Sequence, residues 1–327
     1  MPKVLVQGAI AARRAPMLAE MLGPDWQVVS WHPGQDAKDA FSPLATDADV
    51  IVGGGIPVAW PEVGKLKLFQ IPWTGFDFTA PEKMPKGVPV ANTFEHETCI
   101  AEFVLLAMLE WEIGLRHLDS DIRKNGWGGF GPGLAPSHGE VKGKTLGIVG
   151  YGHIGHETAM RAKAFGMRCI GIRRSAQPCT PELDWLGQTD RLDELLAESD
   201  FVLIACDMNE ETIGMMNAER LARMKPTGVI INVARGKIIE EDALFDALES
   251  RRIGGAVIDT WYNYGDGTWP SNRPFQELDN VILSPHRSAV TEEMHARRWR
   301  FVADQCERVA RGQPPENVVF HGVGPSG

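Results

Sequence analysis

The sequence is poor in cysteine, has no excess of positive charge and contains no long hydrophobic run. Its five cysteines are an odd number, scattered through 327 residues without CxxC or Cys/His ligand spacing. We therefore expect reduced thiols, no disulfide framework and no metal site. The net charge of −10 argues against nucleic acid or an anionic membrane as the main partner. No apolar stretch reaches the length of a bilayer span.

The apolar run in the opening stretch, MPKVLVQGAI, is too short for a secretory signal peptide, so we expect a cytoplasmic protein. A length of 327 residues with 43% hydrophobic content allows two domains of ordinary size, each with its own core. The sequence contains short apolar runs that alternate with amphipathic stretches of helical period. This alternation predicts an α/β protein with parallel sheets.

A strand, a glycine turn and a helix are predicted at Lys144–Gly155, KTLGIVGYGHIG, and the residues that follow. Gly150 permits the tight turn, Gly152 lets a pyrophosphate approach bare backbone, and Gly155 lets the helix pack close to its strand. A second strand at Met167–Ile172 completes a unit of about one βαβ crossover. Because the whole unit is present, we favour a dinucleotide-binding fingerprint over a glycine turn in an ordinary α/β domain.

Two groups of residues are expected to contact the phosphates of the cofactor. The opening amides of the helix, among them those of His153 and Ile154, would face the pyrophosphate. At the end of the second strand, where an NAD site usually has an acidic residue, the chain reads Arg173, Arg174 and Ser175. Two guanidiniums and a hydroxyl suit the extra phosphate of NADP. We therefore predict NADP as the preferred cofactor; the alternative is NAD, with both arginines merely solvated.

Apolar periodicity divides the rest of the chain into strands and helices. In the first domain we expect strands at 4–7, 27–31, 49–52, 66–71 and 88–91 and a helix at 11–22. The carboxyl ends of these strands mark candidate ligand loops at 53–58, 72–77 and 92–97. One long helix is expected at 97–124, then a loop at 127–136. Beyond the fingerprint we expect helices at 190–197, 218–224 and 242–250, strands at 201–205, 229–233, 256–259 and 281–283, and a terminal helix at 291–311 that packs back on the first domain.

Three strands of the second domain end in groups suited to hydride-transfer chemistry. Arg235 and His286 each follow a strand, and Asp259 ends the strand between them. Histidine titrates in the range needed to carry a proton to or from an alcohol oxygen, and arginine holds a carboxylate through two parallel hydrogen bonds. Taken alone, Arg235 could equally form a surface salt bridge, and His286 could be a hydrogen-bonded loop residue.

Four motifs in this order resemble the D-isomer-specific 2-hydroxyacid dehydrogenase family. They are GIVGYGHIG, IINVARG, GAVID and NVILSPH. The resemblance implies a Rossmann-type doubly wound parallel sheet for the cofactor at 98–291, and a flavodoxin-like substrate domain formed by 1–97 and 292–327. Members are usually dimers joined largely through the cofactor domain, so a homodimer is implied as well.

The resemblance also implies roles for individual residues. Arg235 would bind the substrate carboxylate and polarise its carbonyl, and His286 would be the general acid in reduction and the base in oxidation. Ala234 and Asp259 would lie beside the nicotinamide, with Asp259 facing its carboxamide. Four residues would bind the substrate or shape its pocket: Trp73, Thr74, Gly75 and Asn92. Core packing is the alternative role for the aromatic residue.

One position departs from the family pattern. The family places Glu five residues after the Asp, as the partner of the histidine, whereas this chain has Tyr264 there. A carboxylate would raise the pKa of His286, but a phenol supplies at most a hydrogen bond, so the acid form should be scarce at neutral pH. Asp266 is a second candidate partner. A further departure is Asp207, which stands where relatives commonly carry a proline-containing turn beside the cofactor.

The preferred interpretation is an oxidoreductase that transfers a hydride between NADP(H) and a small 2-oxo or 2-hydroxy acid, similar to glyoxylate or hydroxypyruvate or bulkier. One alternative is oxidation of a small anion such as formate or phosphite. The other is a non-catalytic dinucleotide sensor, like the corepressors that share this fold. The presence of both Arg235 and His286 favours the enzyme, because a sensor has less need of a carboxylate clamp together with a proton carrier.

Overall fold

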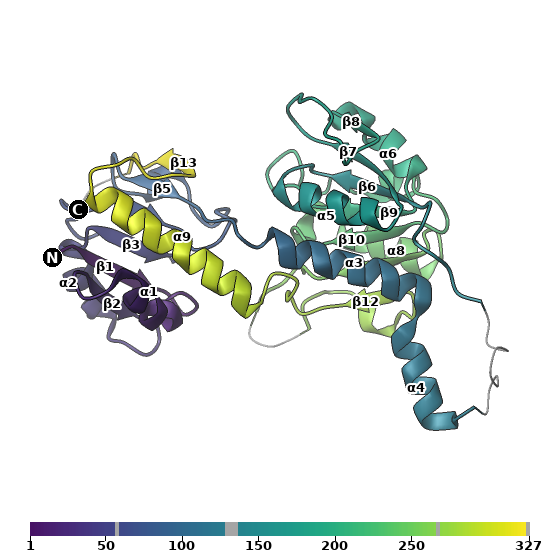
Figure 1. Cartoon of the computed structure of the whole chain (residues 1–327), viewed down its shortest axis with the longest axis horizontal. Helices are drawn as coiled ribbons and strands as arrows, with labels where there is room; N and C mark the ends of the chain where they lie inside the picture. Colours follow the sequence, from purple (N-terminus) through teal and green to yellow (C-terminus); the bar gives the residue numbers. More distant parts are fainter. Residues whose placement is uncertain (56–58, 128–136, 266–268, 325–327) are drawn as a thin grey trace. The chain divides into compact units, whose positions relative to one another are not determined.

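The computed structural model describes the chain apart from residues 56–58, 128–136, 266–268 and 325–327. The described residues form two compact units, one from Met1–Glu95 with Thr291–Gly327 and the other from His96–Val290. Both are α/β units built on a largely parallel sheet, as the sequence predicts (Figure 1). No helix in the described part is long and apolar enough to cross a membrane.

The first unit contains a six-stranded sheet in the order β13-β5-β4-β3-β1-β2. Its strands are β1 (Lys3–Gln7), β2 (Gln27–Trp31), β3 (Val50–Gly53), β4 (Leu68–Gln70), β5 (Pro89–Ala91) and β13 (Val318–His321). The first five pair in parallel, and β13 pairs antiparallel with β5. Apart from this added edge strand, the order is the flavodoxin-like 2-1-3-4-5 arrangement.

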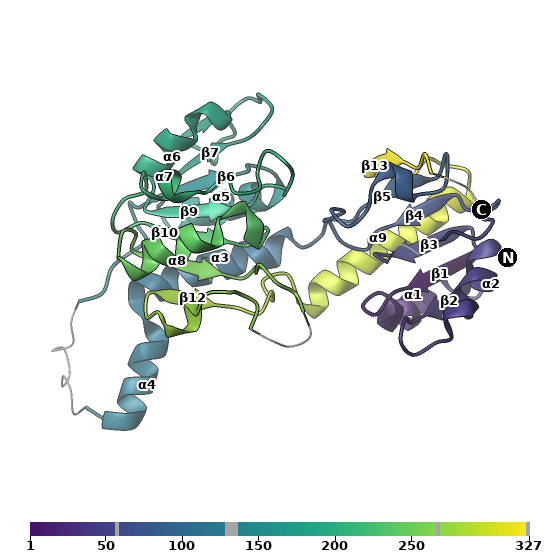
Figure 2. The same cartoon turned by 180° about the vertical axis from the view of Figure 1, so that it is seen from behind.

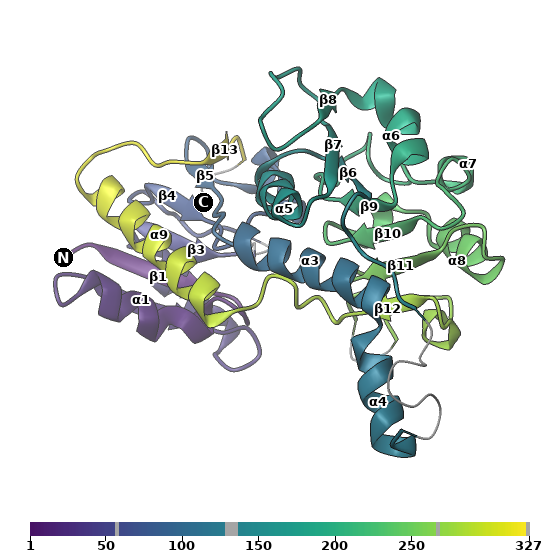
Figure 3. The ribbon, with the colours of Figure 1, turned by 45° about the vertical axis from the view of Figure 1, so that its right-hand side comes forward.

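Helices cover both faces of this sheet. Its helices are α1 (Ala15–Leu22), α2 (Phe41–Thr46) and α9 (Glu292–Ala310). The terminal helix α9 lies beside α1 on one face (Figure 3), where Trp299 and Val302 pack with Leu18 and Val4. The prediction that the terminal helix returns to the first domain is therefore confirmed. The other face buries a second cluster around Phe41.

The second unit contains a seven-stranded, wholly parallel sheet in the order β12-β11-β10-β9-β6-β7-β8. Its strands are β6 (Thr145–Val149), β7 (Arg168–Ile172), β8 (Trp185–Gly187), β9 (Phe201–Ile204), β10 (Val229–Asn232), β11 (Gly255–Ile258) and β12 (Val281–Leu283). The strand order reverses at β6, which lies between β9 and β7. Ligands of doubly wound sheets bind at the carboxyl end of such a reversal.

Helices cover both faces of this second sheet (Figure 2). An apolar cluster lies between the sheet and the helices on each face. Its helices are α3 (Glu97–Ile113), α4 (Leu115–Asn125), α5 (His153–Ala164), α6 (Leu192–Glu198), α7 (Ala218–Leu221) and α8 (Glu241–Glu249). One cluster packs α3 and α5 on the sheet, and the other packs α6, α7 and α8. Short 3-10 helices occur at Ala12–Arg14, Lys38–Ala40, Pro81–Lys83, Thr189–Arg191, Gly236–Ile238 and Phe275–Glu277.

Several predicted boundaries are wrong for identifiable reasons. The single helix expected at 97–124 is two helices, because Gly114 adopts a left-handed conformation with φ of +67° and ends α3. The fingerprint helix begins at His153, inside the predicted turn. Strand β12 was expected to be the last in the chain, but β13 follows it, and the short edge strand β8 was missed. The loop predicted at 127–136 lies outside the described residues from 128 onwards.

Candidate active site

The turn after β6 is shaped by a close approach between two strand ends. Gly150 has a φ of +97°, which side chains rarely adopt, and a Cβ there would lie 2.5 Å from the backbone nitrogen of Cys206. That cysteine follows β9, the other strand at the reversal. Its burial raises the pKa of the thiol to about 12, so Cys206 is a packed, protonated group. Glycine is therefore required at position 150 by both conformation and space.

The other two glycines of the turn have contrasting surroundings. A Cβ at Gly152 would meet nothing within 4 Å, so this backbone is open to a ligand. A Cβ at Gly155 would lie 2.9 Å from Cγ2 of Ile148, so α5 packs tightly on β6. Because α5 begins at His153, the amides of Ile154 and Gly155 lie in its first turn, where an amide has no helical carbonyl one turn earlier to bond. An open backbone at a helix N-terminus fits a pyrophosphate.

Two arginines stand at the end of β7. Arg173 is half-buried and Arg174 and Ser175 are exposed. The Arg173 amide donates to the carbonyl of Gly187 at 3.1 Å, which fixes where the segment leaves the sheet. Among the residues that the structure describes, neither guanidinium has an ion-pair partner, whereas Arg168 pairs with a glutamate at 2.6 Å. Arg173 and Arg174 are thus available to bind a phosphate.

The loop after β10 is braced by the side chain of Asn232. Its amide donates to the Arg235 carbonyl at 2.9 Å, and its oxygen accepts from the Ala234 amide at 3.1 Å. Arg235 is half-buried, and its Nη1 donates to the Ala234 carbonyl at 2.9 Å. Asn232 is 3% exposed. The bracing therefore fixes the position from which the guanidinium of Arg235 projects.

Asp259 anchors the loop that carries His286. Its carboxylate is fully buried and accepts from the Ser284 hydroxyl at 2.6 Å, the Arg287 amide at 2.8 Å, and both the amide and the hydroxyl of Ser288. His286 itself has a φ of +55°, a strained conformation for a residue with a side chain. The bonds to the two following amides hold the backbone in that conformation. The contact predicted between Asp259 and a nicotinamide carboxamide stays a prediction.

The imidazole of His286 contacts the ring of Tyr264, with centroids 5.4 Å apart and planes inclined at 54°. The Tyr264 hydroxyl turns instead to the backbone, where it accepts from the Trp261 amide at 3.0 Å. Within the described ranges, His286 makes no hydrogen bond. Tyr264 therefore contacts His286 through its ring, and in the described part of the chain no hydrogen bond joins the two side chains. Asp266, the other candidate partner, lies outside the described residues.

The surroundings of His286 favour the neutral imidazole. The protein around the ring removes water and lowers the pKa of His286, the negative charge of Asp259 opposes this, and the positive charge of Arg235 lowers the pKa further. The direction agrees with the sequence-based expectation of a scarce acid form. It also means that Arg235 is near enough for its charge to act on His286.

The remaining predicted residues lie in the first unit. The hydroxyl of Thr74 donates to the Thr93 carbonyl at 2.9 Å, and the Asn92 side chain donates to the Thr74 carbonyl at 2.8 Å. Gly75 is half-buried in the same loop. Trp73 is half-buried and packs on the core; a Cβ at Gly54 would lie 1.8 Å from its ring. The structure thus brings these residues together at the carboxyl ends of β4 and β5.

Some residues that shape the site were missed from the sequence. Asn232, Ser284 and Ser288 position the predicted groups. Asn232 and Ser284 lie within the motifs IINVARG and NVILSPH, whereas Ser288 lies outside all four motifs. Asp207 is exposed, and its carbonyl accepts from the Thr212 hydroxyl at 2.7 Å. In the described part of the chain, no group of three or more His, Cys, Asp or Glu side chains could hold a metal ion.

Comparison with known proteins places these features in a family context. The model described as D-isomer specific 2-hydroxyacid dehydrogenase, NAD binding domain, matches residues 105–288. A glyoxylate reductase from Thermococcus onnurineus is 30% identical over 330 residues, which cover 97% of this chain and 96% of that protein.

Two solved structures extend the likeness over both units. An NADPH-dependent glyoxylate/hydroxypyruvate reductase from Sinorhizobium meliloti, in complex with NADP and sulfate, has a TM-score of 0.78 at 23% identity and covers 98% of each chain. A D-isomer specific 2-hydroxyacid dehydrogenase from Lactobacillus delbrueckii ssp. bulgaricus, in its NAD-complexed form, has a TM-score of 0.77 at 21% identity, covering 97% of this chain and 100% of the other. At these identities the likeness concerns the fold.

Proposed function

The chain belongs to the D-isomer specific 2-hydroxyacid dehydrogenase family, and we propose that it transfers a hydride between NADP(H) and a small 2-oxo or 2-hydroxy acid. It is an NAD(P)-dependent enzyme of the 2-hydroxyacid dehydrogenase and reductase class. The observation that carries the proposal is the set of groups at one sheet edge. Three adjacent strands, β10, β11 and β12, deliver Arg235, Asp259 and His286 there.

The open backbone at Gly152 and the first turn of α5 fit a dinucleotide. When bound, the nicotinamide supplies or accepts the hydride. Arg235 binds the substrate carboxylate through its donor fork and polarises the carbonyl. His286 gives a proton to the carbonyl oxygen in reduction and takes it from the hydroxyl in oxidation. Asp259 positions the imidazole by holding the backbone of its loop.

We propose further substrate and cofactor contacts from the residues that the family pattern marks. Trp73, Thr74, Gly75 and Asn92 would bind the substrate carboxylate or shape the pocket for its side chain. The hydrogen bonds that fix Thr74 to Thr93 and to Asn92 support this role, since a binding loop must be held in one conformation. Ala234 would lie beside the nicotinamide, and Asp259 would face its carboxamide.

The preference for NADP(H) over NAD(H) is proposed from the two arginines after β7. Arg173 and Arg174, with the Ser175 hydroxyl, would hold the 2′-phosphate, which NAD lacks. This role is supported by the finding that neither arginine has an ion-pair partner among the described residues. The relatives contain both cofactors, NADP in one structure and NAD in another, so the family fold by itself leaves the choice open.

A homodimer in the cytoplasm is also proposed. The support for self-association is α4, which exposes Leu115, Leu118 and Ile122 at 62%, 46% and 48%. These residues follow a spacing of three and four, so they lie on one face of the helix. The cytoplasmic location is supported by the scattered cysteines and the composition.

The decisive experiment measures absorbance of NADPH and NADH with a panel that includes glyoxylate, hydroxypyruvate, phenylpyruvate and, in the oxidative direction, formate and phosphite. We expect turnover of a 2-oxo acid and a lower KM for NADPH. Arg235→Lys should raise the KM for the oxo acid at least tenfold, because an ammonium lacks the bidentate fork, and leave the Kd of NADPH unchanged. Cofactor binding without turnover would favour the sensor, and turnover of formate or phosphite alone would favour the anion dehydrogenase.

A further inference from the structure

The side chain of Tyr151 leaves the glycine turn and crosses β7. A Cβ at Gly171, in the middle of β7, would lie 3.4 Å from the Cβ of Tyr151, so the tyrosine passes directly over this glycine. Its side chain is almost fully buried, with the residue 4% exposed. The hydroxyl emerges beyond β7, 2.5 Å from the hydroxyl of Thr180. A buried phenol of this kind needs a polar partner, and here the partner belongs to a distant loop.

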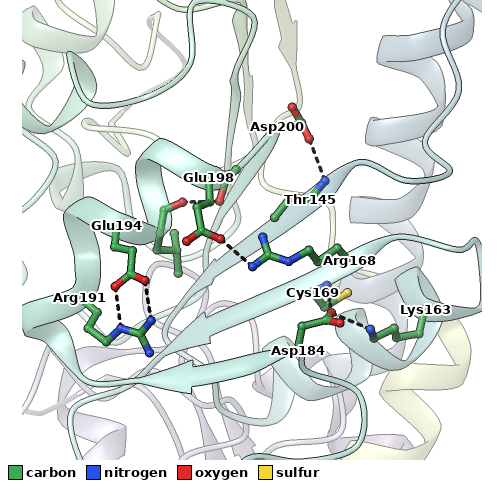
Figure 4. A network of polar contacts seen from close by, with 11 residues as sticks. Thr145, Lys163, Arg168, Cys169, Asp184, Arg191, Glu194, Glu198 and Asp200 are labelled. Carbon is green, nitrogen blue, oxygen red and sulfur yellow. Dashed lines mark hydrogen bonds and ion pairs between the residues drawn. The ribbon is translucent and has the colours of Figure 1, made fainter.

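That loop, residues 173–184, is the one that begins with the two arginines, and we call it the phosphate segment. Its far end is held by Asp184, whose carboxylate accepts from the Cys169 amide at 2.9 Å and from Nζ of Lys163 at 2.6 Å (Figure 4). Residues 174–179 are exposed. Between these exposed positions and the anchored end, Thr180 is the point where the side chain of Tyr151 reaches the segment.

A second contact reinforces this tie from α5. Nδ1 of His156 lies 3.2 Å from the Tyr151 hydroxyl and 3.8 Å from Oε2 of Glu182, which belongs to the phosphate segment. The hydroxyl can donate to one of its two neighbours while it accepts from the other. Tyr151 is therefore the centre of a polar group that joins the segment to the first turn of the fingerprint helix.

The backbone of the same tyrosine is joined to the near end of the segment. The carbonyl of Ile172, directly before Arg173, accepts from the amides of Gly150 at 3.0 Å and Tyr151 at 2.9 Å. Tyr151 thus bonds through its main chain where the segment begins and through its side chain where the segment returns. We propose that Tyr151 is a positioning residue that couples the glycine turn to the phosphate segment and so sets the discrimination between NADPH and NADH.

This inference rests on the proposed binding of the 2′-phosphate by Arg173 and Arg174. The guanidiniums of Arg173 and Arg174 bind the 2′-phosphate more tightly when the backbone of the segment is already fixed. A mobile segment would have to be ordered on binding, which costs conformational entropy. Removing the tie should therefore weaken the contacts to the 2′-phosphate. Binding of NADH should change little, since its ribose carries no such phosphate.

The experiment compares the Kd of NADPH and of NADH, measured by nucleotide fluorescence on the full-length protein. Tyr151→Phe keeps the ring over Gly171 and removes only the hydroxyl. Loss of one buried hydrogen bond corresponds to a factor of about five, so we expect the Kd of NADPH to rise about fivefold and that of NADH to change less than twofold. Thr180→Val should reproduce this effect, and Thr180→Ser, which keeps a hydroxyl, should restore values near wild type.

A double-mutant cycle separates positioning from a general structural role. In a background with Arg173→Ala and Arg174→Ala, Tyr151→Phe should leave the Kd of NADPH unchanged within twofold, because the groups that it positions are gone. An equal fivefold loss in both backgrounds, or equal losses for NADPH and NADH, would overturn the inference. If the wild-type protein binds NADPH no tighter than NADH, the proposed cofactor preference fails before any Tyr151 variant is measured, and the inference fails with it.

Discussion

At the scale of single residues, the proposed proton transfer depends on what surrounds His286. Its ring contacts a phenol rather than a carboxylate, and burial lowers its pKa with help from the charge of Arg235. In the proposed mechanism reduction needs the imidazolium, so reductive kcat should fall as the pH rises through this lowered pKa. Oxidation needs the neutral imidazole, so oxidative kcat should persist to correspondingly lower pH.

Tyr264→Glu tests this dependence. A carboxylate within reach of the imidazole would stabilise the charged form and raise the pKa of His286, so the fall of reductive kcat should move upward by about 1 pH unit. The measurement is the pH profile of kcat with saturating oxo acid and cofactor. Tyr264→Phe is the matched control, since it keeps the ring contact and adds no charge, and its profile should stay in place. A profile for Tyr264→Glu that coincides with wild type would refute the view that the side chain at position 264 influences the pKa of His286.

Asp259→Asn tests whether the buried carboxylate holds the His286 loop. Asparagine places an NH2 group where two amides and two hydroxyls now donate, so at least one buried donor is left unsatisfied. We expect a loss of about 2–3 kcal/mol in the free energy of unfolding, measured by urea denaturation. The matched control is Asp279→Asn at an exposed ion pair with Arg251, which should change stability by less than about 0.5 kcal/mol. Equal effects would show that Asp259 is not an anchor.

The sequence was sufficient to predict that Arg235 and His286 lie at one edge of the sheet, because both follow apolar runs that form neighbouring parallel strands. Their catalytic roles stay a prediction. It was not sufficient for the bonds between Asp259 and the serines. These bonds join residues 25 to 29 positions apart, and a serine in a loop carries no local signal of such a partner. The orientation of the Tyr264 hydroxyl is similarly a product of packing, since the backbone amide of Trp261 competes for it.

At the scale of elements, two of the fingerprint glycines are expected to serve different purposes, one the stability of the fold and the other the binding of the cofactor. Gly155→Ala would force a Cβ to 2.9 Å from Ile148, whereas Gly152→Ala would place its Cβ in open space. We expect Gly155→Ala to lower the free energy of unfolding by about 1–3 kcal/mol. Gly152→Ala should keep the stability and raise the Kd of NADPH at least tenfold, because the methyl group occupies the space left for the pyrophosphate.

Denaturation curves and cofactor titrations of both variants check this pair, and each variant serves as the control for the other. A Gly152→Ala protein that binds NADPH like wild type would remove this glycine from the cofactor site. A Gly155→Ala protein of unchanged stability would mean that α5 can move away from β6 at no cost.

Elements with strong apolar periodicity were predicted well, and the failures have two physical causes. Strands β1, β7, β9 and β10 were found within one residue of their bounds, because buried strands form short apolar runs in the sequence. The missed strands, β8 and β13, are edge strands whose residues are only partly buried or exposed, so they lack that pattern. The division of α3 from α4 depends on the left-handed conformation of Gly114, whereas a glycine inside a helical pattern is often tolerated.

At the scale of the whole molecule, α4 carries an exposed apolar face that suits contact with a second copy of the chain. The helix is otherwise strongly polar, with an ion pair between Arg123 and Asp119, yet Leu115, Leu118 and Ile122 are exposed together on one side. A symmetric dimer uses the same patch on both copies, so each apolar position in the interface contributes two buried side chains, one from each copy. Fully burying one leucine contributes about 1.5–3 kcal/mol.

Leu118→Glu should therefore cost the dimer roughly 3–6 kcal/mol, twice the value for one buried leucine, and this corresponds to a dissociation constant at least a hundredfold higher. Light scattering coupled to size-exclusion chromatography should give the dimer mass for wild type and the monomer mass for the variant at micromolar concentration. Ile213→Glu is the control, because Ile213 is exposed at 53% in the same unit but belongs to another segment, and this variant should stay dimeric. A monomeric wild type, or a Leu118→Glu protein that dimerises as well as Ile213→Glu, would exclude α4 from the interface, and the leucines would then be solvated positions of an isolated helix.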